Sequence, residues 1–265
     1  MTRGRRSAFE QLLQDPCERR LLLRGGVGAL LGMALGAPAG KALAAGEMAE
    51  ADQGRLAEQL SRCHPAGDPL KALLAGNRRF AQVWRQTRGD LDPRQRMQRF
   101  AALWSENCQP DPASLARGQR PWAAVLACAD SRVAPEWLFD VGPGALFDVR
   151  CAGNTAFPAG VASLEYAVAQ LQVPLILVLG HSGCGAVRAA LSETALTPLL
   201  QELVDPIRAC LKPGMKLDEA VQANARASAA SLSRQSPLLA EAVAAGRLTI
   251  ASAVLDLDSG LVQRL

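Results

Sequence analysis

Four short apolar runs alternate with helix-like segments from residue 122 onward. The runs cover 122–127, 145–149, 173–179 and 249–255. Continuous apolar runs of this length, bounded by turn residues, are typical of strands buried on both faces. Helical spacing is found at 161–171, from Gly185, at 196–210 and at 217–233. The alternation predicts an α/β fold with a mostly parallel central β-sheet flanked by helices.

The part of the chain before the first predicted strand has a helical pattern. Residues 45–67 are polar and helical in spacing, and we interpret them as a linker that leads into the domain. Asp68 has the position of an N-cap, and an Arg-rich helical stretch follows it to about Trp104. We therefore expect a domain spanning 68–265 that starts with an N-terminal helical arm.

The composition excludes global disorder, because 49% of the residues are hydrophobic and only 20% are charged. The net charge of +4 is unevenly distributed: seven of the 29 basic residues, but only three of the 25 acidic ones, lie in residues 1–41. The rest of the chain is electrically neutral. This balance argues against a nucleic-acid partner, which needs a net basic surface.

The first 44 residues have the pattern of an export signal. Arg19 and Arg20 precede a weakly apolar run at 25–40, and Ala42-Leu43-Ala44 is a small-residue cleavage pattern. The paired arginines indicate the twin-arginine route, which exports folded proteins. We expect cleavage before Ala45 and a periplasmic location, or an equivalent compartment outside the cytoplasm.

Two other interpretations of the run at 25–40 stay open. An uncleaved run would anchor the chain in a membrane, but its 16 residues are fewer than the ~20 that a helix needs to span a bilayer. An amphipathic helix of the fold is disfavoured by six glycines. After cleavage we expect no contact with a membrane.

Metal-binding side chains follow two of the predicted strands. The first strand runs into Cys128 and Asp130, and the third runs into His181 and Cys184. Ligands of parallel sheets bind at the carboxyl ends of the strands. Two thiolates and an imidazole favour zinc. Whether Asp130 is the fourth ligand stays undecided from the sequence. If it binds the metal, the site is closed; if it does not, one position stays free for water, as in catalytic zinc sites.

The glycine-rich turn at 180–185 does not fit three other motifs. A P-loop would have Lys where Ala186 stands, and a dinucleotide fingerprint would have Gly where Arg188 stands. A nucleophile elbow would have Gly where Cys184 stands. Phosphate binding and serine-hydrolase chemistry are therefore disfavoured.

The metal-ligand spacing resembles a known family. Cys-x-Asp-x-Arg at 128–132, followed 53 residues after its Cys by His-x-x-Cys, resembles the β-class carbonic anhydrases. Further similar segments lie at 74–80, 118–121, 147–150, 153–154, 163–168 and 256–260. The resemblance covers about residues 68–265, in matching order and spacing.

The resemblance implies reversible hydration of CO2 to bicarbonate and a proton by attack of a zinc-bound hydroxide. One Zn2+ per subunit would be held by Cys128, His181 and Cys184, with Asp130 as the ligand of a closed state. In the family, Asp130 and Arg132 form a dyad: the arginine holds the carboxylate off the metal, and the carboxylate orients the hydroxide.

The resemblance also implies the substrate pocket and the oligomer. Gln119 and the backbone N–H of Gly185 would bind oxygens of CO2 or bicarbonate, and Phe147, Ala152 and Tyr166 would form its apolar wall. Part of this pocket comes from a partner chain in the plant-type members, so we expect a homodimer or a higher even oligomer.

Two alternative functions stay open: hydrolysis of CS2 or COS on the same fold, and a non-catalytic scaffold that binds zinc or bicarbonate. We interpret Cys63, Cys108, Cys151 and Cys210 as packing residues, with disulfides as the alternative in an exported protein. Cys151 departs from the family, which usually has Asn at this position. We interpret His64 as solvated.

Overall fold

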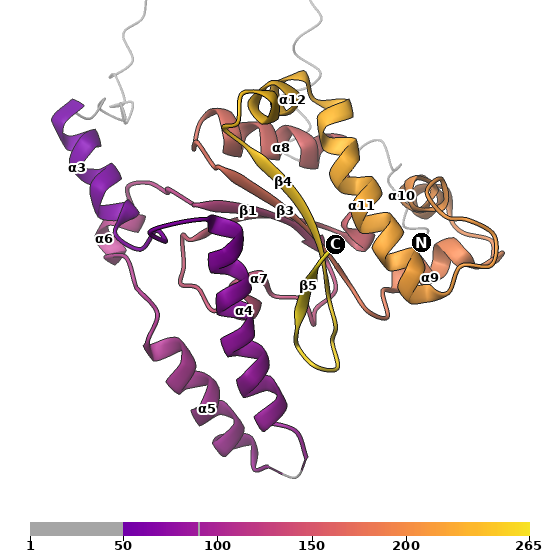
Figure 1. The fold of residues 1–265 in the computed structure, drawn as a ribbon, viewed down its shortest axis with the longest axis horizontal. Helices are drawn as coiled ribbons and strands as arrows, with labels where there is room; N and C mark the ends of the chain where they lie inside the picture. The colour runs from indigo at the N-terminus through magenta and orange to yellow at the C-terminus, as the bar shows by residue number, and fades with distance from the viewer. Residues whose placement is uncertain (1–49, 90) are drawn as a thin grey trace, which may run out of the picture. The chain divides into compact units, whose positions relative to one another are not determined.

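A central five-stranded sheet organises the computed structural model, which describes residues 50–89 and 91–265 (Figure 1). Its strands are β1 (Ala123–Cys128), β2 (Leu146–Cys151), β3 (Leu175–His181), β4 (Thr249–Leu255) and β5 (Val262–Arg264). Their order is β2-β1-β3-β4-β5, and only the last pair is antiparallel. The mostly parallel α/β sheet is confirmed. The predicted export signal lies outside the described residues.

The two central strands are buried at every position, which explains their continuous apolar sequences. Successive side chains of a strand point to opposite faces of a sheet. Val125 and Leu177 accordingly belong to one hydrophobic cluster, while Leu126 and Val178 belong to another. The sheet therefore has a separate core on each face.

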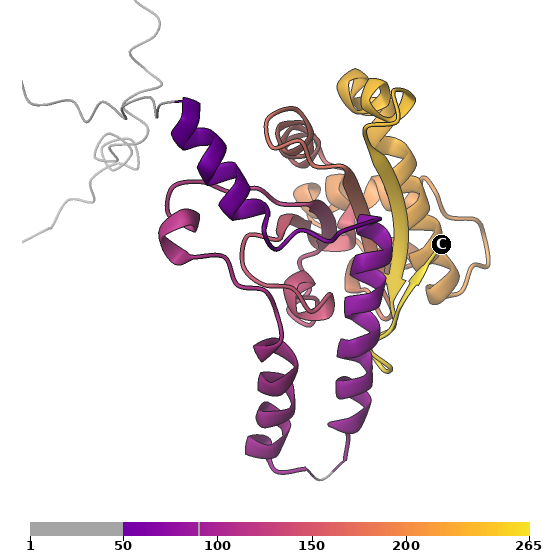
Figure 2. The same ribbon diagram turned by 60° about the vertical axis from the view of Figure 1, so that its left-hand side comes forward.

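Helices cover both faces of the sheet. They are α3 (Glu50–Ser61), α4 (Pro69–Gln86), α5 (Pro93–Ser105), α6 (Pro112–Leu115), α7 (Pro135–Leu138), α8 (Pro158–Ala169), α9 (Gly185–Leu191), α10 (Pro198–Arg208), α11 (Leu217–Gln235) and α12 (Pro237–Ala244). Helices α4, α5 and α7 contribute to the core on one face, and α8, α11 and α12 to the core on the other (Figure 2). A third cluster, from α9, α10 and α11, packs at the metal-binding end of the sheet.

The expected helical arm consists of α4 and α5, which run side by side (Figures 1 and 2). Asp68 caps α4 as predicted, since its Oδ1 accepts a hydrogen bond from the backbone N–H of Lys71 at 3.0 Å. Aromatic rings join the two helices, with Phe80 and Phe100 at a centroid distance of 5.8 Å. The arm is thus packed on the sheet at its base and held together by its own side chains.

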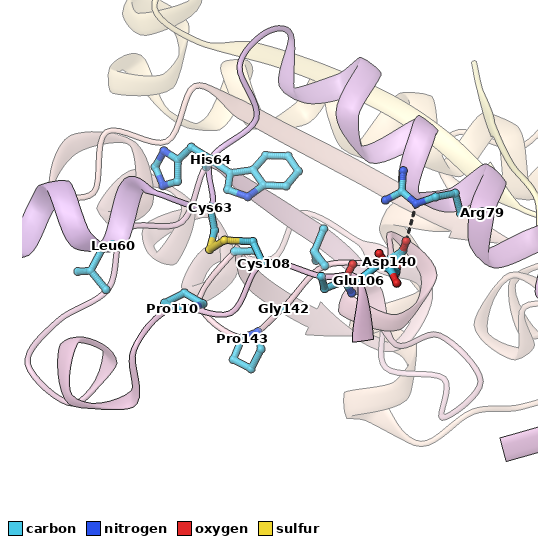
Figure 3. A pocket seen from close by; sticks show the side chains of 15 residues that line it. Leu60, Cys63, His64, Arg79, Glu106, Cys108, Pro110, Asp140, Gly142 and Pro143 are labelled. Carbon is cyan, nitrogen blue, oxygen red and sulfur yellow. Dashed lines mark hydrogen bonds and ion pairs between the residues drawn. A yellow bond between two sulfur atoms is a disulfide. The ribbon is translucent and has the colours of Figure 1, made fainter. Parts of the chain in front are cut away.

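A disulfide joins the linker to the domain, and it corrects our interpretation of two cysteines. Cys63 and Cys108 are bonded, with their Cα atoms 5.4 Å apart (Figure 3). The loops after α3 and α5 meet in space, a juxtaposition that no local pattern reveals. The disulfide borders a cavity of about 230 Å3 that also contains the ion pair between Arg79 and Asp140. No predicted metal ligand lines this cavity.

Cys151 and Cys210, the other two cysteines for which a disulfide was an alternative, have no disulfide partner among the described residues. Cys151 is half-buried and donates to the carbonyl oxygen of Thr155 at 3.3 Å, and Cys210 donates to that of Ile207 at 3.0 Å. The solvated interpretation of His64 is wrong, because its half-buried ring donates from Nε2 to the carbonyl oxygen of Arg120 at 2.7 Å.

The apolar pattern did not predict α12, and it did not predict the short helices α6 and α7. Helix α12 follows α11 after a single residue, Ser236, whose side chain accepts a hydrogen bond from the backbone N–H of Leu239. Pro237 then occupies the first helical position, where its missing N–H costs nothing. Among the described residues, no helix combines the length and apolarity that crossing a membrane requires.

Candidate metal centre

The parallel pairing of β1 with β3 brings the predicted metal ligands together. Cys128 is the last residue of β1 and His181 is the last residue of β3, so both lie at the carboxyl edge of the sheet. The chain then turns through Gly183, which has a φ of 67°, a value that glycine adopts without strain. This turn places Cys184 directly before α9.

The donor atoms fit a tetrahedral zinc ion. The side chains of Cys128, His181 and Cys184 are buried, and their ligand atoms all lie within 4.8 Å of one another. The two sulfur atoms are 4.0 Å apart, and Zn–S bonds of about 2.3 Å at a tetrahedral angle would separate them by about 3.8 Å. The three residues therefore lie close to the geometry that the metal requires.

His181 has the orientation of a metal ligand. Its Nδ1 donates a hydrogen bond to the carbonyl oxygen of Ser182 at 3.0 Å, which leaves Nε2 as the atom available to a metal. Nε2 is buried and has no hydrogen-bond partner among the residues that the structure describes. A buried polar atom without a partner is costly, and a bound metal ion would remove this cost.

The two thiols titrate as a pair. The hydrogen bond with Cys184 lowers the pKa of Cys128, and the backbone N–H of Gly153 also lowers it by donating to the sulfur at 3.3 Å. The same hydrogen bond raises the pKa of Cys184, and burial raises it further. The first negative charge therefore forms on Cys128, and a divalent metal would stabilise both thiolates.

Asp130 and Arg132 form a bidentate ion pair beside the three ligands. Arg132 Nε donates to Oδ1 at 2.9 Å and Nη2 donates to Oδ2 at 2.7 Å. These hydrogen bonds hold the pKa of Asp130 well below its usual range. Oδ2 lies 3.8 Å from His181 Nε2, so the carboxylate faces the ligand cluster.

The ion pair favours the open form of the site. Both oxygens of Asp130 accept hydrogen bonds from Arg132, so neither is free to turn onto a metal without losing one. The cluster of buried donor atoms contains Cys128, His181 and Cys184 without Asp130. Asp130 as a fourth ligand stays a prediction.

Gly153 and Asn224 support the centre, although nothing in their spacing indicated a role. Asn224 on α11 is buried and donates to the carbonyl oxygen of Gly153 at 2.7 Å. Gly153 has a φ of 78°, and a Cβ there would lie 2.7 Å from Ile207 Cδ1. A glycine is therefore required where the backbone N–H reaches the sulfur of Cys128.

Two of the predicted pocket residues lie near the ligands. Ala152 begins the short 3-10 turn η1 (Ala152–Asn154), directly after the residue that pairs with Cys128 in the sheet. Gly185 follows Cys184 and opens α9 with an exposed backbone. Both are in position to border a molecule bound beside the metal.

The other three predicted pocket residues lie away from the ligands of their own chain. Phe147 pairs with Ala124, four residues before Cys128, so about 13 Å of strand separates them. Its ring packs against that of Tyr166 at a centroid distance of 6.3 Å. Gln119 is exposed and precedes β1, so it lies before the end of the strand that is opposite to Cys128, and β1 itself is about 17 Å long.

A pair of carboxyl groups, Asp148 on the edge strand β2 and Glu136 on α7, was not predicted from the sequence. Burial raises the pKa of Asp148 to about 7, and the nearby carboxylate of Glu136 on α7 raises it as well. Within the described part of the chain, Asp148 Oδ1 is buried and has no hydrogen-bond partner. In the sequence, Asp148 stands between Phe147 and Val149, and nothing there indicates that a second carboxyl group lies near it.

Comparison with known sequences identifies a family and relatives. A family model described as carbonic anhydrase matches residues 123–262. A carbonic anhydrase of Mycolicibacterium smegmatis is 37% identical over 211 residues, which cover 75% of this chain and 94% of that protein. Carbonic anhydrase 2 of Mycobacterium tuberculosis is 40% identical over 157 residues, covering 56% of this chain and 76% of that protein.

Solved structures agree with these relatives. A tetrameric β-carbonic anhydrase of Sordaria macrospora has a TM-score of 0.53 at 28% identity, covering 58% of this chain and 84% of its own. A Coccomyxa β-carbonic anhydrase in complex with acetazolamide has a TM-score of 0.52 at 29% identity, and the match covers 58% of this chain and 76% of that chain. The matched family region contains all three metal ligands and the Asp130–Arg132 pair, whereas Gln119 and the helical arm precede it.

Proposed function

The chain belongs to the β-class carbonic anhydrase family, and we propose that it hydrates CO2 reversibly to bicarbonate and a proton at the centre formed by Cys128, His181 and Cys184. The observation that carries the proposal is the combination of three buried zinc-type donors with a carboxylate that Arg132 holds beside them. A purely structural zinc site would not need this ion pair.

The residues around the centre have separate roles. Zinc at this site would supply a Lewis acid that makes a water molecule acidic enough to attack CO2 near neutral pH. Asp130 stays ionised because of Arg132, and its Oδ2 accepts a hydrogen bond from the attacking water. This contact orients a lone pair of the water toward CO2. The backbone N–H of Gly185 donates to an oxygen of the substrate.

The decisive experiment is stopped-flow CO2 hydration with zinc per chain measured on the same sample, across roughly pH 6.5–9. We expect hydration and about one zinc per chain. Cys184→Ser should lose both zinc and activity, whereas Cys210→Ser, which changes a cysteine outside the donor cluster, should lose neither. A zinc-loaded chain without hydration would contradict the proposal, and CS2 and COS would then be tried as substrates.

We propose further that the active form is a homodimer or a higher even oligomer, in which Gln119, Phe147 and Tyr166 serve the centre of a partner chain. Their distance from the ligands of their own chain supports this arrangement. Gln119 is exposed, and Tyr166 is 49% exposed, so both are available to a partner.

Subunit complementation tests the shared site. Chains with Gln119→Ala and chains with Cys128→Ser are each expected to be weakly active. If Gln119 serves the partner, a mixed dimer contains one centre with all its residues intact, and co-expression restores activity. If Gln119 serves its own chain, every centre of the mixed dimer stays defective, and the absence of restored activity would contradict the proposal.

We also propose that the chain is exported to the periplasm or an equivalent compartment by the twin-arginine route, with cleavage before Ala45. The disulfide between Cys63 and Cys108 supports an oxidising destination, because cytosolic thiols are kept reduced. Replacing Arg19 and Arg20 together by Lys should hold the precursor in the cytoplasm. Unchanged export in a cell-fractionation assay would refute the route.

A further inference from the structure

The loop that carries Cys128, Asp130 and Arg132 has few backbone hydrogen bonds of its own. After β1 ends, the N–H of Ala129 donates to the carbonyl oxygen of Cys151, and the N–H of Val133 donates to that of Asp130, both at 3.0 Å. Cys128 is the last residue of β1, and residues 129–134 belong to no helix or strand. Inside the loop, the backbone N–H and the side chain of Arg132 also donate to the Asp130 carboxylate, and the remaining hydrogen bonds of its carbonyl groups come from outside the loop.

Arg150 on β2 supplies most of these contacts. Its Nε donates to the carbonyl oxygen of Cys128 at 3.1 Å. Its Nη2 lies 3.0 Å from the same oxygen, 2.8 Å from that of Asp130 and 2.6 Å from that of Val133. One guanidinium therefore bridges the beginning, middle and end of the loop.

The position of Arg150 is set by the sheet and not by the loop. β2 is an edge strand, and the register pairs Arg150 with Ala127, directly before the first metal ligand. A guanidinium is planar and presents its donors in a fixed fork, so it holds several acceptors in one relative geometry. A single change at Arg150 should therefore release three carbonyl groups at once.

Arg150 has no hydrogen bond to a sulfur, to an imidazole nitrogen or to the carboxylate of Asp130 among the described residues. It is thus neither a metal ligand nor part of the Asp130–Arg132 ion pair. Its hydrogen bonds go to the backbone that fixes where Cys128 and Asp130 lie relative to each other, and its charge also acts on the neighbouring Asp148. This separates its role from that of the residues that contact the reacting groups.

We propose that Arg150 is a positioning residue, which holds the Cys128–Val133 loop in the conformation that presents the Cys128 thiolate to zinc and Asp130 to the attacking water. The part that concerns Asp130 rests on the proposed function. The part that concerns zinc rests only on the donor set. Groups that orient metal ligands through hydrogen bonds typically change metal affinity by 10–100-fold.

The chain offers a matched control for the test. Arg96 on α5 contacts three backbone carbonyls of one loop in the same way, donating to those of Thr87, Gly89 and Leu91 at 3.1, 3.2 and 3.2 Å. That loop carries no metal ligand. Arg96→Ala therefore removes an equivalent set of hydrogen bonds without touching the centre.

The experiment compares Arg150→Ala, Arg150→Lys and Arg96→Ala in the full chain. Each variant is first shown to be folded by circular dichroism, and its zinc affinity is then measured by competition with a chelator. We expect Arg150→Ala to bind zinc at least about tenfold more weakly and Arg96→Ala to bind it normally. Arg150→Lys keeps the charge but not the fork, so its affinity should be intermediate; it also serves as the test if the alanine variant does not fold.

Kinetics and chemical rescue complete the test. In zinc-saturated Arg150→Ala, kcat should fall more than KM rises, because Asp130 is misplaced while substrate access is unchanged. Arg150 is exposed, so millimolar guanidinium should reach the vacated position and restore part of the zinc affinity. Normal zinc affinity in the folded Arg150 variants, or an equal loss in Arg96→Ala, would overturn the proposal. Loss of zinc affinity in a protein whose wild type does not hydrate CO2 would contradict the proposed function and leave the zinc part of this proposal standing.

Discussion

At the scale of single residues, the centre depends on a few polar contacts within a buried environment. Arg132 keeps Asp130 ionised and engages both of its oxygens, and Ser182 fixes which nitrogen of His181 is free. Each of these contacts fixes the orientation of the side chain that it binds. A conservative substitution at such a position should therefore change function without unfolding the chain.

Asp130→Asn tests the role of the carboxylate. The variant should keep its zinc, since the three donors remain, but lose turnover by on the order of 100-fold or more, since Asn accepts and orients the water poorly. The measurement is CO2 hydration at equal zinc content, with Asp205→Asn, an exposed carboxylate on α10, as the control. Near-normal turnover would show that Asp130 does not orient the nucleophile.

Asp148 predicts a pH dependence of stability. Burial raises its pKa from 3.8 to about 7, so the folded chain binds more protons than the unfolded chain between these values. Stability contributed by this group is therefore present below about pH 4 and lost as the pH rises toward 7. Asp148→Asn should gain stability relative to the wild type as the pH rises, by at most about 4 kcal/mol.

Thermal melts at pH 5 and pH 8 check this expectation, with Glu193→Gln as the matched removal of an exposed carboxylate. A stability difference between Asp148→Asn and the wild type that does not change with pH would mean that Asp148 is charged in the folded chain throughout. A difference that shrinks as the pH rises would likewise contradict a raised pKa of Asp148.

At the scale of elements, the apolar pattern located four of the five strands and most of the long helices. It succeeded where burial on both faces leaves a continuous signal, as in β3. It missed α6, α7, α12 and β5, which are short or begin at prolines, because their positions depend on partners far away in the chain. The packing of the arm, α4 and α5, against the rest of the domain depends on distant residues in the same way.

Asn77 on α4 links this helix to α7 and to β5. Its Nδ2 donates to the carbonyl oxygens of Leu138 and Gly260 at 3.1 and 3.0 Å, and its Oδ1 accepts from the N–H of Val262 at 2.7 Å. Asn77→Ala leaves buried backbone groups without partners, so it should lower the free energy of unfolding by about 2–5 kcal/mol. Chemical denaturation measures this loss, and Gln82→Ala, exposed on the same helix, is the control. Equal stability of the two variants would show that Asn77 is not a structural link.

At the scale of the whole molecule, long-range contacts decide how the linker, the arm and the centre are held. The disulfide between Cys63 and Cys108 spans 45 residues and joins the linker to the domain. The expected oligomer would bring Gln119, Phe147 and Tyr166 to a centre that their own chain does not let them reach. Neither the disulfide nor the expected oligomer can be predicted from a single segment of the chain.

Removal of the disulfide tests the first of these features. Cys63→Ser combined with Cys108→Ser should lower the free energy of unfolding by up to about 4 kcal/mol, because a 45-residue loop is no longer closed in the unfolded chain. Zinc content should be unchanged, since neither cysteine is a metal ligand. Dithiothreitol should lower the melting temperature of the wild type but not of the variant; an equal effect on both would contradict a stabilising disulfide.

The sequence by itself determined the α/β class, the strands with continuous apolar runs, and the donor set Cys128, His181 and Cys184 with its Asp130–Arg132 neighbour. These features are local: they depend on residue type and on spacing within or directly after an element. The tertiary structure decided which cysteines pair, that His64 is half-buried, that Arg150 and Asn224 support the centre, and that three predicted pocket residues lie a strand length away. Such contacts join residues tens of positions apart, and their distances follow from strand order and register, which no single segment encodes.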